Sequence, residues 1–232
     1  MSIAVELDQV TCRDADQALN GVSVAVPAGK LTIVTGSGRN LFMRVATGLS
    51  APEFGTVRLG GRVLTGLNAS ARARVRRERA GMMLEPELLT AATVRDNILL
   101  PLRLAGRPAG SGLLAETAAF TGVADLLARP AHDLTGEQRR RVALARALIT
   151  DPAAVFAFDP TSGLPEDDAR KLTALLRAVV TRRAGTVVAA TRDPHLAGSG
   201  DRLVVVHGGQ TVEEIGPENV ARAVRRMSTR EG

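Results

Sequence analysis

From residue 31 onward, short apolar runs of strand length alternate with longer stretches in which apolar residues recur at helical spacing. The apolar runs are residues 31–34, 80–84, 153–158 and 186–190, and the main helical stretches are residues 41–48, 134–149 and 166–182. Strands without a polar face have to be covered on both sides, as parallel strands connected by helices are. The sequence therefore predicts an α/β fold with a mostly parallel sheet core.

The N-terminal part of the chain has a different pattern. Residues 3–7, 21–26 and 56–59 are rich in alternating and β-branched side chains, with Gly and Pro between them. This pattern is typical of antiparallel strands. A hairpin is also expected from residues 202–206 and 211–215. We therefore expect an antiparallel N-terminal subsheet beside the parallel core.

Residues 93–131 have a mostly helical pattern that is interrupted by Gly and Pro. Because this stretch lies between two parts of the core, it indicates an inserted helical subdomain. We expect residues 1–232 to form a single domain, with residues 1–84 and 134–232 as the core and residues 85–133 as the helical subdomain. A chain of 232 residues that is 45% hydrophobic can fill one large core.

The chain is basic, with a formal net charge of +6, and almost all of its positive charge comes from arginine. Lys30 and Lys171 are the only lysines, and no Trp or Tyr is present to stack on bases, which argues against binding of single-stranded nucleic acid. Arginines crowd residues 72–79, where we expect the solvated face of a short helix. Residues 221–232 have the pattern of a basic helix that frays into a tail.

The compartment is indicated by what the chain lacks. Its one cysteine, Cys12, excludes an internal disulfide, and the N-terminus has no secretory leader pattern. No apolar run reaches the roughly 20 residues that a membrane-spanning helix needs. We therefore expect a cytoplasmic protein that serves a membrane only through a partner.

Four motifs follow one another in a fixed order. They are Thr93-Val94-Arg95-Asp96-Asn97, the helical stretch beginning Leu134-Thr135-Gly136-Glu137-Gln138, Asp159-Pro160-Thr161-Ser162-Gly163-Leu164, and Thr191-Arg192-Asp193-Pro194. The second is similar to the signature LSGGQ followed by QRVALARAL, the third to the end of DEPTSGLD, and the fourth to the switch segment THDP. The chain thus resembles the ATP-binding cassettes of ABC transporters, in particular the branch that serves lipoprotein release, macrolide export and cell division.

The resemblance covers nearly the whole chain and implies a P-loop NTPase-like cassette acting as the nucleotide-binding-type subunit of a transporter. It implies two partners, a transmembrane permease and a second cassette in a homodimer or heterodimer. It also implies a peripheral location on the inner face of the cell membrane. ATP and Mg²⁺ are the implied ligands, and we expect both to bind weakly.

The loop that should hold phosphate departs from the pattern G-x-x-x-x-G-K-[ST]. In that pattern, backbone N–H groups hold the phosphates, the Lys contacts the outer phosphates and the hydroxyl binds Mg²⁺. With Gly38 at the second Gly, Ile33 stands at the first, and the loop is shorter than the pattern by about three residues. The implied nucleotide-binding residues of this loop are Gly36, Ser37, Gly38, Arg39 and Asn40. Arg39 is bulkier than Lys, and Asn40 offers Mg²⁺ an amide oxygen in place of a hydroxyl.

The residues at the implied catalytic positions also differ from the family pattern in ways that weaken ATP hydrolysis. Asp159 stands at the position of the catalytic Glu and is one methylene shorter, while Phe158 replaces the Asp that holds Mg²⁺. Arg192 stands at the switch histidine. Glu85 stands at the Q-loop glutamine and is, with Asn40, an implied Mg²⁺ ligand. We therefore expect no ATP hydrolysis by this chain alone.

The signature contributes four further implied nucleotide contacts. They are Thr135, Gly136, Glu137 and Gln138. Thr135 keeps a hydroxyl that can cap the following helix. Glu137, in place of Gly, brings a carboxylate to a helix N-terminus that faces the partner's γ-phosphate in the family, and a carboxylate there repels ATP.

Three functions remain open on this sequence. The first is a degenerate cassette subunit that binds a permease and a second cassette. The second is a functional ATP-hydrolysing subunit in which Arg39, Glu85 and Asp159 take over the missing roles. The third is a basic module that binds nucleic acid or an anionic membrane, and it is supported by charge alone.

Overall fold

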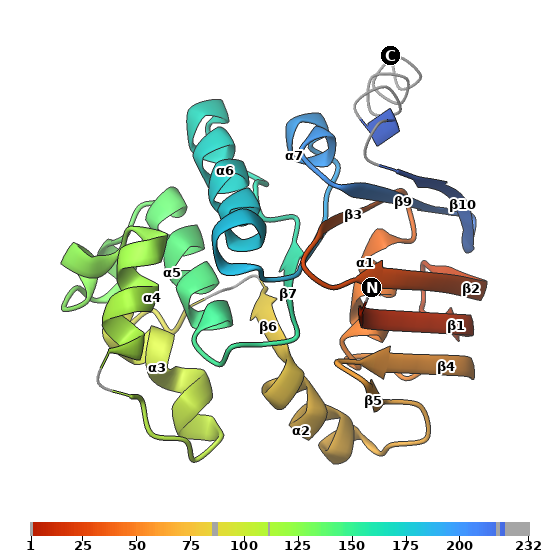
Figure 1. Ribbon diagram of the computed structural model, residues 1–232, viewed down its shortest axis with the longest axis horizontal. Coiled ribbons are helices and arrows are strands. Elements are labelled where there is room, and N and C mark those ends of the chain that lie inside the picture. Colours follow the sequence, from red (N-terminus) through yellow and green to blue (C-terminus); the bar gives the residue numbers. More distant parts are fainter. Residues whose placement is uncertain (1, 85–87, 111, 217–218, 221–232) are drawn as a thin grey trace.

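The computed structural model describes residues 2–84, 88–110, 112–216 and 219–220. The strands in this part of the chain form a six-stranded sheet, in the order β10-β9-β3-β8-β7-β6, and a four-stranded sheet, in the order β2-β1-β4-β5 (Figure 1). The first sheet comprises β3 (Leu31–Thr35), β6 (Ala80–Met83), β7 (Ala154–Phe158), β8 (Val187–Ala190), β9 (Arg202–His207) and β10 (Gln210–Ile215). The second comprises β1 (Ile3–Arg13), β2 (Ala18–Pro27), β4 (Phe54–Leu59) and β5 (Arg62–Val63).

Helices cover both faces of the six-stranded sheet. They are α1 (Arg39–Ala46), α2 (Ala69–Arg79), α3 (Val94–Leu104), α4 (Leu113–Thr121), α5 (Gly136–Leu148), α6 (Glu166–Arg183) and α7 (Pro194–Gly198), with 3-10 turns η1 (Ala124–Leu126) and η2 (Ala131–Asp133). In Figure 1, α5 and α6 lie to one side of this sheet, and α1 lies to the other side with the four-stranded sheet.

The strand directions confirm the predicted fold class. Strands β6, β7, β8, β3 and β9 pair in parallel, and β10 adds an antiparallel edge strand to β9. Strands β1, β2, β4 and β5 pair antiparallel in the N-terminal sheet. The molecule is therefore an α/β structure with a mostly parallel core and an antiparallel N-terminal subsheet.

Alternate residues of the central strands face opposite cores. Ile33 and Ala157 pack in the core that α5 and α6 cover, whereas Val34 and Phe156 pack in the core shared with α1 and the four-stranded sheet. All four side chains are fully buried. This two-sided burial explains why the central strands appear in the sequence as apolar runs.

Strand β1 is longer than the five residues that alternation predicts. The chain bulges at Gln9, whose φ is +48°, and the register with both neighbouring strands shifts around it. A bulge moves the following residues to the opposite phase, so the alternating pattern is lost after Leu7. Gly55 of β4 faces the bulge, and a Cβ there would lie 2.4 Å from the Gln9 carbonyl oxygen.

The arginine-rich residues 72–79 lie in α2, as predicted, but their face is not wholly solvated. Val75 is buried against the core. Arg72 and Arg76 both donate to the carbonyl oxygen of Gly48, at 3.3 and 3.1 Å. Part of this cluster therefore attaches the helix to the turn after α1.

The helical pattern predicted for residues 93–131 is present as α3, α4 and the two 3-10 turns. The basic tail predicted for residues 221–232 lies outside the described residues. Across the described ranges, no helix has both the length and the apolar character that crossing a membrane requires.

Candidate functional site

The loop between β3 and α1 is folded against strand β9. The Gly38 N–H donates to the Val206 carbonyl oxygen at 3.0 Å. A Cβ on Gly36, whose φ is +92°, would lie 2.3 Å from that oxygen, and a Cβ on Gly38 would lie 2.6 Å from Val206 Cγ1. Both glycines are therefore required by the close approach of the loop to β9, whether or not a phosphate binds.

Other backbone N–H groups at the start of α1 also donate hydrogen bonds to acceptors within the protein. The Leu41 N–H donates to the Gln17 side-chain oxygen at 3.0 Å. The Arg39 N–H points back to the Gly36 carbonyl oxygen at 3.4 Å. In a phosphate-binding loop such groups point toward the ligand. Here these N–H groups donate to protein atoms around the short loop instead. The Ser37 side chain also contacts the protein, with its Oγ 3.4 Å from Nδ1 of His207.

Arg39, at the position of the P-loop lysine, is paired with Asp159. Its Nη2 lies 3.1 Å from Asp159 Oδ2, and its Nε donates to Oδ1 at 3.4 Å. Nη1 donates to the Gly36 carbonyl oxygen at 3.3 Å. The Arg39 side chain is only 9% exposed and that of Asp159 is 31% exposed. This two-point contact neutralises the positive charge of the loop and holds the carboxylate expected to act in catalysis.

The backbone of Asp159 sets the direction of its carboxylate. Its φ is +41°, in the left-handed region that Asp tolerates better than most residues. The Asp159 N–H donates to the Ala190 carbonyl oxygen at 2.9 Å, and its own carbonyl accepts from the Ser162 N–H at 3.0 Å. These bonds hold the turn after β7 in the conformation that directs Asp159 to Arg39.

The described residues around the predicted metal position supply few of the oxygen ligands that Mg²⁺ requires. Asn40 keeps one buried side-chain oxygen without a hydrogen-bond partner in the described part of the chain, but Phe158 contributes no ligand and Asp159 is engaged by Arg39. Mg²⁺ requires a near-octahedral set of oxygens. No group of three potential metal-binding side chains is found among the described residues. Glu85, the other predicted ligand, lies outside them.

A cavity of about 470 Å³ brings three of the predicted residues together. Arg39, Asp159 and the exposed Arg192 line it. Its other lining residues come from the turn after β7, the start of α6 and the segment after β8: Thr161, Ser162, Leu164, Glu166, Ala169, Thr191 and Asp193. Sequence reasoning missed Thr161 and Thr191 as lining residues, although both stand inside the quoted motifs. Both hydroxyl-bearing residues are buried.

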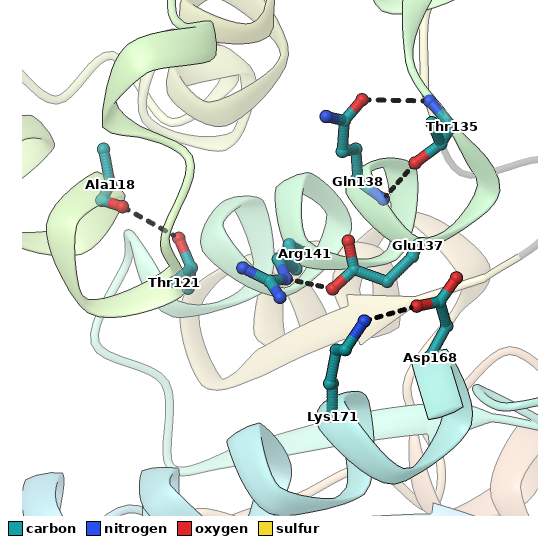
Figure 2. A network of polar contacts seen from close by, with 8 residues as sticks. All are labelled: Ala118, Thr121, Thr135, Glu137, Gln138, Arg141, Asp168 and Lys171. Carbon is teal, nitrogen blue, oxygen red and sulfur yellow. Dashed lines mark hydrogen bonds and ion pairs between the residues drawn. The ribbon is translucent and has the colours of Figure 1, made fainter. Parts of the chain in front are cut away.

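Two of the four predicted signature residues complete the capping box of α5. The Gln138 N–H donates to Thr135 Oγ1 at 3.2 Å, and the Thr135 N–H donates to Gln138 Oε1 at 3.0 Å (Figure 2). The predicted cap by Thr135 is thus confirmed. Gly136 lies against Leu164, because a Cβ there would lie 3.3 Å from Leu164 Cδ2.

Glu137 is paired within the chain and does not carry a free carboxylate, while its repulsion of a partner's phosphate stays a prediction. Its side chain is 11% exposed and pairs with Arg141 one turn further along α5. Figure 2 shows it on the side of α5 that faces Lys171 and Asp168 of α6, which pair at 2.9 Å. The hydrogen bond and charge of Asp168 raise the pKa of Lys171, and the charge of Glu137 adds to this effect. The i,i+4 spacing of Glu137 and Arg141 was the available sequence signal.

Residues 19–162 match the family model described as ABC transporter. The chain therefore belongs to the ATP-binding cassettes of ABC transporters. It is 33% identical over 204 residues to the "Methionine import ATP-binding protein MetN" of Brucella abortus (strain 2308), covering 85% of this chain and 55% of that protein. It is 31% identical over 200 residues to the "Macrolide export ATP-binding/permease protein MacB" of Salmonella paratyphi A, covering 84% of this chain and 31% of that protein.

The chain spans about half the length of the methionine-import relatives and a smaller share of the macrolide-export relative. The match to the macrolide-export relative fits the predicted branch. Among solved structures, the ATP-binding cassette MJ0796, a dimer bound to ADP and Pi, matches with a TM-score of 0.79 and 25% identity over 92% of this chain and 98% of that one. CbiO1 from Clostridium perfringens matches with a TM-score of 0.83 at 18% identity, over 99% of this chain and 96% of that one, which shows a shared fold.

Proposed function

We propose that this chain is a cassette subunit of an ABC transporter whose own phosphate loop does not support ATP hydrolysis. The ion pair between Arg39 and Asp159 carries this proposal. The loop cation and the nearby carboxylate neutralise each other, so neither is free for phosphate or for an attacking water. Phe158, next to that carboxylate, cannot hold Mg²⁺.

We further propose that ATP binds weakly at this loop. Phosphate binding at a helix N-terminus depends on N–H groups that point at the ligand. At the start of α1, the N–H groups of Gly38 and Leu41 donate to Val206 and Gln17 instead. Binding of ATP would have to break contacts that close the loop onto β9.

The proposed partners are a transmembrane permease and a second cassette, with the chain on the inner face of the membrane. The family supports this arrangement, and the similar cassette MJ0796 is dimeric. In a mixed dimer, a competent partner would supply the working phosphate loop and this chain would supply the signature from Thr135 to Gln138. The chain would then contribute assembly and regulation to a site whose chemistry depends on the partner.

The test has two arms. In the first, the purified chain is incubated with Mg²⁺ and ATP, and phosphate release is compared with that of heat-inactivated protein and of Asp159→Asn. We expect no difference among the three. Release that exceeds the control and disappears in Asp159→Asn would overturn the proposal and make the chain a hydrolysing subunit.

In the second arm, the tagged chain is used to capture proteins from detergent-solubilised membranes of its own cells, and mass spectrometry identifies what is retained. We expect a multi-span membrane protein together with a second cassette that carries an intact G-x-x-x-x-G-K-[ST] loop. Retention of nucleic acid or anionic lipid alone, lost at high salt, would favour the basic-module function.

A further inference from the structure

Asn97 ends the first of the four motifs, residues 93–97, and the proposed function gives it no role. It lies near the start of α3 and is fully buried. Its Oδ1 accepts the Leu89 N–H at 2.8 Å, and its Nδ2 donates to the carbonyl oxygens of Leu89 and Thr93, both at 3.0 Å. Because a buried amide is costly without partners, these bonds fix residues 89–93 against the start of α3.

Residues 89–95 are in turn paired with residues 127–132. Four backbone hydrogen bonds join the two segments, and Thr93 forms an antiparallel bridge with Pro130. The donors are the N–H groups of Val94, Arg95, Ala131 and His132, and the acceptors are, in the same order, the carbonyl oxygens of Arg129, Leu127, Ala92 and Thr90. The four distances are 2.9, 3.0, 2.9 and 3.0 Å. Because the bonds run in both directions, the two segments form one hydrogen-bonded unit, which we call the loop unit.

The loop unit leads directly into the signature. Its last residues belong to the turn η2, where the Leu134 N–H donates to the Ala131 carbonyl oxygen at 3.4 Å. Leu134 is buried, and the next residue, Thr135, caps α5 together with Gln138 (Figure 2). Because only residues 133 and 134 separate the loop unit from Thr135, a shift of the unit moves the first turn of α5.

The rest of α5 is held in a different way. Val142 is fully buried in the core that also contains Leu102 of α3. The first turn of α5 is less enclosed, since Gly136 is partly exposed and lies against Leu164. The loop unit attaches this turn to α3. The position of the signature therefore depends on polar contacts that begin at Asn97, whereas the body of α5 depends on the core.

We propose that Asn97 is a positioning residue for the signature of this chain. The inference rests on the proposed function, in which residues 135–138 face a nucleotide held by a second cassette. Asn97 acts through the loop unit: it holds residues 89–93, which hold residues 127–132 and with them the start of α5. Loss of its amide should loosen the first turn of α5 while the core stays closed.

Amide hydrogen exchange of the isolated chain measures this loosening. Asn97→Ala leaves the N–H and carbonyl groups of Leu89 without their side-chain partner. We expect exchange in residues 88–95 and 127–139 to become at least about tenfold faster, because local opening becomes easier there. Exchange in β3 and β7 should stay unchanged. Faster exchange that is confined to residues 88–95, or that is equally large in β3 and β7, overturns the proposal.

The matched control for this measurement is Asp96→Ala. Asp96 precedes Asn97 in α3, and its side chain bonds to Thr93 Oγ1 and to Arg103. Its removal leaves the bonds between Asn97 and Leu89 in place. Faster exchange in this variant should therefore stay within α3, and an equal rise at residues 127–139 would contradict the role given to the Asn97 amide.

The second measurement is the ATP affinity of the dimer formed with the captured second cassette, by titration with a fluorescent ATP analogue. We expect Asn97→Ala to weaken this affinity about tenfold. Asp201→Asn is the control for a general loss of stability, because Asp201 bonds to Leu31 and Arg177, outside the loop unit. It should leave the ATP affinity unchanged. Equal affinities of the two variants overturn the proposal, even if exchange at the signature is faster.

Circular dichroism establishes first that Asn97→Ala is folded. If it is not, Asn97→Ser takes its place, since a hydroxyl keeps one donor and an acceptor for residues 89–93. The same pattern of exchange is then expected at smaller amplitude. An unchanged exchange rate at residues 127–139 in Asn97→Ser overturns the proposal as well.

Failure of the proposed function can be separated from failure of this inference, because the exchange measurement needs no partner. If no second cassette is captured but exchange rises at residues 127–139 in Asn97→Ala, the proposed function fails and the role of Asn97 in holding the start of α5 remains. If a second cassette is captured and its dimer binds ATP, but Asn97→Ala changes neither measurement, the inference fails and the proposed function stands.

Discussion

Arg39 and Asp159 are 120 residues apart in the sequence, yet they form a two-point ion pair at 3.1 and 3.4 Å beneath the loop that should hold phosphate. The Arg39 side chain is almost fully buried. Among the described residues, Asp159 is the one carboxylate that forms an ion pair with it. The pair has consequences for stability as well as for chemistry.

Removal of the Asp159 charge should destabilise the protein. Asp159→Asn keeps a residue that tolerates the left-handed backbone, but it leaves Arg39 without its counter-ion, and we expect a loss of about 1–3 kcal/mol in the free energy of unfolding. Urea denaturation followed by circular dichroism measures it. The control is Asp168→Asn in the exposed Lys171 pair, for which about 0–1 kcal/mol is expected. Equal losses in both variants would show that burial of Arg39 does not strengthen its pair.

Phe158→Asp alone should not restore ATP hydrolysis. The new carboxylate would supply a Mg²⁺ ligand, but the Gly38 and Leu41 N–H groups would still donate to Val206 and Gln17. Phosphate release in the presence of Mg²⁺ is therefore expected to stay at the level of the unaltered chain. Circular dichroism should confirm that the variant is folded. Ordinary Mg²⁺-dependent turnover in this single variant would refute the role given to the closed loop.

In a dimer with a competent cassette, replacement of Arg141 should weaken ATP binding, although Arg141 lies outside the segment that resembles LSGGQ. Because Arg141 neutralises Glu137, Arg141→Ala frees a negative charge near the partner's γ-phosphate. We expect ATP affinity of the mixed dimer to fall by roughly tenfold, or about 1.4 kcal/mol. The double variant Glu137→Ala/Arg141→Ala should recover most of it, as measured by titration with a fluorescent ATP analogue. An equal loss in the double variant would mean that the charge of Glu137 never reaches the nucleotide.

Asp201 should contribute stability that depends on pH. Burial alone would raise its pKa, but the hydrogen bond from Arg177, the Leu31 N–H and nearby positive charges outweigh burial and lower it. A lowered folded pKa means that the contribution is fully present above the ordinary value near 4 and is lost as pH falls through the folded value.

The corresponding variant is Asp201→Asn. At pH 7 it should lower the free energy of unfolding by about 1.5–3 kcal/mol, and the difference from the unaltered chain should shrink as the pH falls below about 4. Urea denaturation at several pH values measures this difference. Asp8→Asn makes the same charge change at an exposed position and should have little effect at any pH. A difference that grows on acidification would contradict the direction given for the Asp201 pKa.

The sequence by itself determined the architecture of this protein, because its main signals are local. The apolar runs of β3 and β7 require burial on both faces, and Thr135 with Gln138 specifies the start of α5 through contacts three residues apart. The family resemblance also came from short motifs, each within one turn or helix. The strand predicted from alternation ends at Leu7, whereas β1 continues to Arg13, because a bulge changes the phase of alternation.

The tertiary structure alone decided what the site residues contact. The sequence shows that Arg39 replaces a lysine, but the pairing of β3 and β7 with β8 brings Asp159 to its guanidinium, and the pairing of β3 with β9 brings Val206 to the Gly38 N–H. Likewise, Arg146 belongs to a helix whose pattern was clear, yet only the packing of α2, β6 and α3 around it places it at the wall of a cavity of about 210 Å³. Contacts between residues far apart in the chain depend on the three-dimensional arrangement of whole elements, and no local spacing encodes them.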